Sequence, residues 1–167
     1  MRHRRYGRRQ SLKPRDLIKP AEILLSSNTK KPTQVCLRRA VSSLYYALFH
    51  CLARECADLL IGGPNSGRSP EAWLQVYRSL EHGIARERCK NTKMLAKFPN
   101  GIQDFADAFV EIQQKRYDAD YNPSVQFAKA SVKTDLILVE GAIAKFLSEP
   151  KSDRRAFCVY ILFKQRK

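Results

Sequence analysis

Acidic residues, glycine and long apolar runs are all scarce in this chain of 167 residues. It has 16 Asp and Glu against 31 Lys and Arg, which gives a formal net charge of +15. The longest apolar runs, residues 44–49 and 156–163, are too short to span a bilayer. No apolar segment follows the basic start, so a signal peptide is not expected. The sequence therefore predicts a cytoplasmic protein with no membrane partner.

Several chemical motifs are missing as well. The seven glycines form no phosphate-binding loop of the Walker or dinucleotide kind, which argues against ATP hydrolysis and nicotinamide chemistry. The five cysteines are odd in number and show no Cys-x-x-Cys spacing, so neither a disulfide framework nor a zinc ribbon is indicated. His50, Cys51, Cys56, His82 and Cys89 could converge on a metal, but buried cysteines in a reducing compartment explain them more simply. We expect no metal and no cofactor.

The positive charge is concentrated at the two ends. Residues 1–15 carry +7 and residues 151–167 carry +5, whereas residues 16–150 carry only +3. Basic arms around a nearly neutral body are typical of proteins that neutralise phosphates, so RNA is the expected partner. A merely solvated tail or an anionic membrane surface is the alternative. Candidate RNA contacts in the N-terminal arm are Arg4, Arg5, Arg8 and Arg9.

No stretch shows the sustained alternation of a strand, and Gly, Pro and Ser/Asn punctuation divides the body into helices. The sequence predicts an all-α, up-and-down bundle of five helices at residues 14–26, 33–61, 70–90, 100–119 and 123–148. The last of these is expected to start at the pair Asn122-Pro123, as a cap followed by proline. The predicted division is an arm (1–13), a helical domain (14–149) and a basic C-terminal extension (150–167). The spacing of apolar residues alone does not decide whether residues 155–163 form a helix or a strand.

The second predicted helix carries a polar stripe through an apolar surface. At 100° per residue, Arg39, Ser43, Tyr46 and His50 stack along one face, and leucine and valine line another. Such a helix must build a core and also present hydrogen-bonding groups to a partner or a substrate.

Two motifs resemble the HEPN superfamily of small helical nucleotide- and RNA-binding domains. They are the Arg-Ala-x-Ser-x-x-Tyr-Tyr-Ala-x-Phe-His pattern at 39–50 and the Arg-Tyr-x-Ala-Asp-Tyr pattern at 116–121. The resemblance implies a HEPN-like bundle over roughly residues 15–148. It also implies a homodimer that acts on RNA, as a metal-independent endoribonuclease of the toxin or host-defence kind.

The sharpest candidates for catalysis are Arg78 and His82. A spacing of four places them on one face of the predicted third helix, with Gln75 and Arg86 beside them as RNA-binding candidates. Metal-free RNA cleavage needs an imidazole to move protons and guanidinium groups to bind the phosphate. Catalytic HEPN proteins separate their Arg and His by slightly more than the three residues found here. A solvated basic face with an incidental histidine is the competing interpretation.

The polar residues of the second helix are expected to be structural. His50 is interpreted as a buried histidine that bonds to Asp118 or Asp120, and Arg39 is predicted to form an ion pair with Asp120 that fixes the packing beside Tyr46. The tyrosines at positions 45, 46, 117 and 121 are interpreted as core residues with tethered hydroxyls.

Two further functions compete with the endoribonuclease. One is a non-catalytic RNA- or nucleotide-binding module, and the other is a helical partner of a nucleotidyltransferase or an antitoxin.

Overall fold

The computed structural model describes residues 14–26 and 32–164, and every regular element in these two ranges is an α-helix. The all-α prediction is thus confirmed for this part of the chain, but with eight helices in place of five. They are α1 (Pro14–Ser26), α2 (Gln34–Leu60), α3 (Pro70–Arg78), α4 (His82–Cys89), α5 (Thr92–Leu95), α6 (Asn100–Tyr121), α7 (Lys129–Ser148) and α8 (Lys151–Leu162). None of the helices in the described part is long and apolar enough to cross a membrane.

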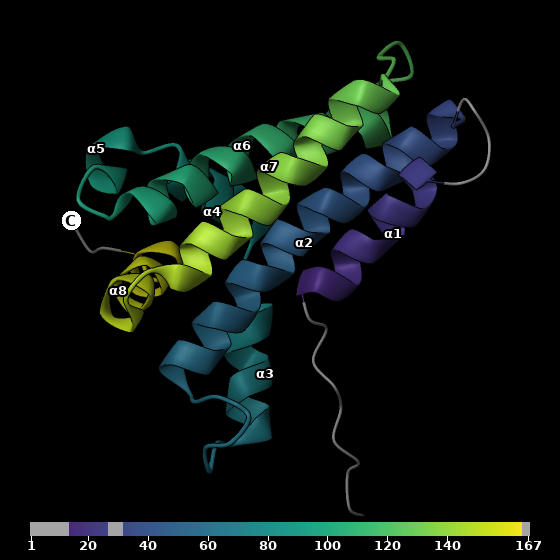
Figure 1. The fold of residues 1–167 in the computed structure, drawn as a ribbon. Coiled ribbons are helices and arrows are strands. Elements are labelled where there is room, and N and C mark those ends of the chain that lie inside the picture. The colour runs from purple at the N-terminus through teal and green to yellow at the C-terminus, as the bar shows by residue number, and fades with distance from the viewer. Residues whose placement is uncertain (1–13, 27–31, 165–167) are drawn as a thin grey trace, which may run out of the picture.

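Helix α2 is the centre of the molecule. It contacts α1, α3, α6, α7 and α8, and Figure 1 shows α1, α2 and α7 lying side by side, with α6 next to α7. Apolar residues recur every three or four positions along α2, and Leu37, Val41, Leu44, Leu48 and Leu52 are all buried. A helix surrounded in this way needs partners for its polar side chains from several neighbours.

The predicted third helix is interrupted at residues 79–81. Helix α3 ends at Arg78, and its C-cap is Ser79, whose hydroxyl donates to the carbonyl of Val76 (2.8 Å); α4 begins at His82. Leu80, which lies between the two helices, is buried in the core. Serine and the following Gly83 are also weak helix formers. Arg78 and His82 therefore do not share a helical face.

The start of α7 also differs from the prediction, because Asn122-Pro123 does not cap a helix. Gln34 on α2 bonds to both backbone groups of Phe127 (2.8 and 2.9 Å). Arg38 donates to the carbonyls of Ala119 (2.8 Å), Asn122 (3.0 Å) and Val125 (2.6 Å). These bonds satisfy the backbone in a non-helical path, and α7 starts only at Lys129.

Residues 62–69, which connect α2 to α3, are held at Arg68. Its guanidinium donates to the carboxylate of Asp58 (2.6 Å) and to the carbonyl of Gly62 (2.7 Å), and it lies 4.6 Å from the centre of the Trp73 ring. The Trp73 indole donates to the same carboxylate (2.7 Å). This network fixes α3 to the end of α2.

The predicted boundary at residue 150 cuts through the core. Residues 151–162 form α8, in which Phe157, Cys158 and Ile161 are almost completely buried. Arg154 on α8 also forms an ion pair with Glu55 on α2, and both side chains are largely shielded from solvent. Most of the predicted C-terminal extension is thus part of the helical domain. The N-terminal arm lies outside the described residues.

Candidate functional site

The two motifs that carried the family resemblance meet in space. Between α2 and the C-terminal half of α6 lies an open cleft of about 500 Å³, which we call the α2–α6 cleft. Its lining residues are Val35, Arg38, Arg39, Ser42, Tyr46, Arg116, Ala119, Asp120 and Tyr121. Three of these side chains are arginines, so the cleft favours an anionic ligand.

Asp120 is held by Arg116 and Ser42, and Arg39 takes no part. The Ser42 hydroxyl donates to Asp120 Oδ1 (2.8 Å), and Arg116 Nε lies 2.7 Å from Asp120 Oδ2. The Nε–H has no acceptor in line with it, so this second contact is an ion pair and not a hydrogen bond. Arg39 is exposed and makes no ion pair within the described residues. The predicted Arg39–Asp120 pair is therefore wrong, because a nearer arginine one turn away on α6 already neutralises the carboxylate.

Arg116 connects the cleft to a cluster of aromatic rings. Its guanidinium donates to the Tyr46 hydroxyl (3.3 Å) and lies 5.7 Å from the centre of the Tyr46 ring. The Tyr46 ring in turn contacts both histidines, with centroid distances of 6.0 Å to His50 and 6.3 Å to His82. Tyr46 thus lies between the cleft, which it lines, and the two imidazoles, which do not line it.

His82 is the first residue of α4, and its ring is exposed yet firmly held. Nδ1 lies 2.6 Å from the hydroxyl of Tyr45, and the ring stacks on Phe49 at a centroid distance of 3.9 Å. Its backbone carbonyl accepts a hydrogen bond from Gln113 on α6 (3.0 Å). These contacts come from α2 and α6, so helix packing fixes the imidazole and leaves Nε2 as its available nitrogen.

His50 is held in the same way by a different residue. Its Nδ1 lies 2.6 Å from the hydroxyl of Tyr77 on α3, and the two rings stack at 5.8 Å. The predicted bond from His50 to Asp118 or Asp120 is absent, because those carboxylates lie on α6 with other partners. Two tyrosine hydroxyls thus orient two neighbouring imidazoles.

Burial and charge favour the neutral form of both rings. Partial burial lowers the pKa of His82 below its usual value of 6.5, and the positive charge of Arg116 lowers it further. Burial also lowers the pKa of His50, with a second contribution from His82. Burial raises the pKa of Tyr45, so its hydroxyl keeps its proton at neutral pH. The positive charge that lowers the pKa of His82 thus comes from Arg116 on α6.

The other predicted site residues are separate from this surface. Arg78 and Gln75 are exposed on α3, and neither lines the α2–α6 cleft. Arg86 is half-buried and donates to the side chain of Gln114 on α6 (2.9 Å). Arg4, Arg5, Arg8 and Arg9 lie outside the described residues.

The four tyrosines fall into two groups. Tyr45 is fully buried and Tyr46 is half-buried, as expected for core residues with bonded hydroxyls. Tyr117 and Tyr121 are 56% and 63% exposed, so the interpretation as core residues is wrong for this pair.

Sequence reasoning missed Arg116, Ser42, Tyr45 and Tyr77 as site residues. The spacing of Arg116 and Asp120 was the available signal, since residues four apart on a helix lie on one face. Nothing local marks Tyr45 or Tyr77, whose roles depend on histidines that lie 37 and 27 residues away.

Comparison with family models, curated proteins and solved structures gives no match for this chain. Among the described residues no group of three or more His, Cys, Asp or Glu side chains could hold a metal ion.

Proposed function

We propose that this chain binds RNA in the α2–α6 cleft and cleaves it as a metal-independent endoribonuclease. The observation that carries the proposal is the exposed, oriented and neutral imidazole of His82 beside the guanidinium of Arg116. Further support comes from the net charge of +15, and from the fact that both HEPN-like motifs line the same cleft.

His82 is suited to move a proton in either direction. When the Tyr45 hydroxyl accepts from Nδ1–H, Nε2 is free to take the proton of the 2′-hydroxyl. The ring is then an imidazolium, which keeps its Nδ1–H bond to the hydroxyl and can give the Nε2 proton to the leaving 5′-oxygen. The buried hydroxyl itself stays protonated, so it accepts the bond from Nδ1–H without taking its proton.

The arginines and His50 complete the chemistry. Arg116 and the exposed Arg39 would bind the scissile phosphate and the charge that develops on it in the transition state. Attack of the 2′-oxygen on phosphorus breaks the bond to the 5′-oxygen and leaves a 2′,3′-cyclic phosphate. The reaction needs a base for the first oxygen and an acid for the second. A neutral imidazole that takes the first proton becomes the imidazolium that protonates the second oxygen, and His50 lies beside His82 as a second group of this kind.

A non-catalytic RNA- or nucleotide-binding module is the alternative. The pairing of Arg116 with Asp120 favours it, because an arginine that is already neutralised contributes less to the stabilisation of a transition state. In that case the cleft would bind phosphate and the histidines would be structural.

Incubation of the full chain with end-labelled RNA in EDTA separates these functions. The endoribonuclease predicts fragments with 2′,3′-cyclic phosphate ends, and the binding module predicts a complex without fragments. Absence of both would contradict any action on RNA and would favour a helical partner of another protein.

Variants then assign the residues. Loss of a proton-transfer group typically lowers the rate about 10²- to 10⁴-fold, which is the expected result for His82→Ala. Arg116→Met and Arg78→Ala compare the arginine in the cleft with the one at the end of α3. We expect cleavage to depend on Arg116, and Arg116→Lys tests whether charge alone suffices. Arg155→Ala, which changes an exposed arginine on α8, is the control.

A further inference from the structure

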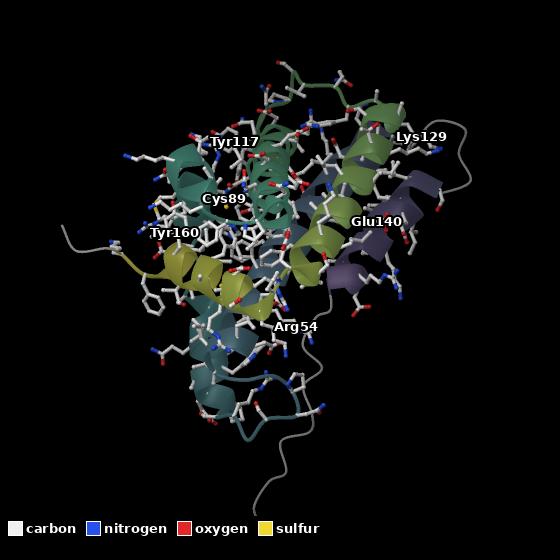
Figure 2. All side chains as sticks on the ribbon, turned by 60° about the vertical axis from the view of Figure 1, so that its left-hand side comes forward. Arg54, Cys89, Tyr117, Lys129, Glu140 and Tyr160 are labelled. Atoms are coloured by element: carbon white, nitrogen blue, oxygen red, sulfur yellow. The ribbon has the colours of Figure 1, made fainter. Side chains whose placement is uncertain are left out.

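The pair Tyr117 and Tyr121 is exposed and lies outside the hydrophobic core. Their rings lie on one face of α6 with centroids 5.1 Å apart, and neither hydroxyl makes a hydrogen bond within the described residues. Large aromatic side chains that are more than half exposed contribute little to a core. In the view of Figure 2, Tyr117 lies toward the top of the molecule, above Cys89 and Tyr160.

The pair adjoins the α2–α6 cleft. Tyr121 lines the cleft, and its ring centre lies 5.8 Å from the guanidinium of Arg116. Gln113, whose side chain bonds to the carbonyl of His82, precedes Tyr117 by four residues and therefore lies on the same face of α6. The two rings thus lie beside the proposed phosphate site.

We propose that Tyr117 and Tyr121 form a stacking platform for an unpaired base, so that the ligand of the cleft is single-stranded RNA. The inference rests on the proposed action on RNA and specifies its substrate class. Aromatic rings beside guanidinium groups are the combination that holds single strands, because each base offers a flat face and each phosphate a charge. In a duplex the bases stack on one another, and the platform has nothing to bind.

Binding of 2′-O-methyl oligonucleotides, measured by fluorescence anisotropy with the full chain, tests the proposal. These probes have no nucleophilic 2′-hydroxyl, so binding is measured without cleavage. The single strand and the same sequence annealed to its complement are compared. Tyr117→Ala and Tyr121→Ala should each weaken single-strand binding roughly 5- to 100-fold, with duplex affinity almost unchanged.

The control is Phe163→Ala, which removes an aromatic ring of the same 56% exposure at the end of α8. Tyr117→Phe and Tyr121→Phe keep the stacking surface and should bind as the parent does. If the alanine variants bind single strands as tightly as the parent, or lose single-strand and duplex affinity equally, the platform does not exist. Parent protein that binds neither probe would instead contradict the proposed function itself.

Size-exclusion chromatography of the same variants tests the competing role of this surface. An apparent mass that is unaffected by Tyr117→Ala is expected of an RNA platform. A change from dimer to monomer would make the pair an interface between copies of this chain and would overturn the proposal.

Discussion

Replacement of Arg38 by alanine should destabilise the fold more than any other single change of an arginine on α2. Its guanidinium bonds to five carbonyls, three of them at 3.0 Å or less, in the last turn of α6 and on the segment that follows it. Hydrogen bonds to a charged group contribute about 1.5 to 3 kcal/mol each, but bonds from one group are not additive. Because the carbonyls at the end of α6 would also lose their cation, we expect a loss of ~4 kcal/mol.

That loss is large against the ~5 to 15 kcal/mol by which domains are usually stable. For a chain of this size it corresponds to a decrease in melting temperature of about 8 to 16 °C. Circular dichroism during thermal and urea unfolding measures the change. Arg38→Lys keeps the charge but has a single nitrogen, so about half of the loss is expected. Arg155→Ala, on the exposed side of α8, should change stability by less than about 0.5 kcal/mol.

Arg38→Ala should increase opening of the segment that Arg38 holds more than opening of the rest of the protein. Backbone amides of residues 118–128 should exchange with solvent faster in the variant, while those of α8 keep the parent rates. A loss of stability below ~1 kcal/mol, or uniform exchange throughout the protein, would refute the role of Arg38 as the clamp of this segment.

Three further changes test other parts of the structure. Removal of residues 151–167 deletes α8 and leaves Glu55 without Arg154, so the shortened chain should fail to fold cooperatively in urea. The free energy of unfolding should decrease as the pH falls below about 6.5, because the folded state lowers the pKa of His82 and the unfolded chain then binds more protons. His82→Ala should weaken this pH dependence. An unchanged pH profile in the variant would show that the pKa of His82 is not lowered by folding. Deletion of residues 1–13 removes six Lys and Arg, so log affinity for RNA should fall less steeply with log salt, and an equal slope would leave the arm without phosphate contacts.

Local chemistry explains what could be predicted of the fold. Thr33 caps α2 and Ser69 caps α3, each through its own side chain and a backbone N–H three residues later. The spacing of apolar residues predicted a helix at residues 33–61, and α2 spans Gln34–Leu60. Signals of this kind act over a few residues, so a sequence displays them directly.

Contacts between residues far apart in the sequence explain where the predicted fold was wrong. The segment after Asn122 is non-helical because its carbonyls accept hydrogen bonds from Arg38. Arg38 lies more than 80 residues earlier in the chain. The helix after residue 150 belongs to the core because Arg154 meets Glu55, 99 residues away. None of these contacts can be recognised from the residues next to the segment that they hold.

The candidate site also combines local signals, which the sequence displays, with contacts between distant residues, which it does not. The two motif segments line one cleft, but the sequence paired Asp120 with the wrong arginine and His50 with the wrong helix. A stripe of polar residues predicts that partners exist, whereas the identity of each partner depends on how α3, α4 and α6 pack around α2.

Stability does not by itself require this stripe of polar groups. Replacing a paired polar set by apolar residues of similar volume is often neutral or stabilising, so a helix at the centre of a bundle has no need of Ser42, Tyr46 and His50. Each of them nevertheless has a partner on a neighbouring helix, and the partners Arg116 and Tyr77 are directed at one surface. The imidazole of His82 is exposed although Tyr45, the residue that orients it, is fully buried. A buried hydroxyl that holds an exposed ring stabilises one orientation of that ring more than it stabilises the fold. Fixed orientation is what proton transfer demands of an imidazole, and this is the strongest structural reason to look for chemistry at His82.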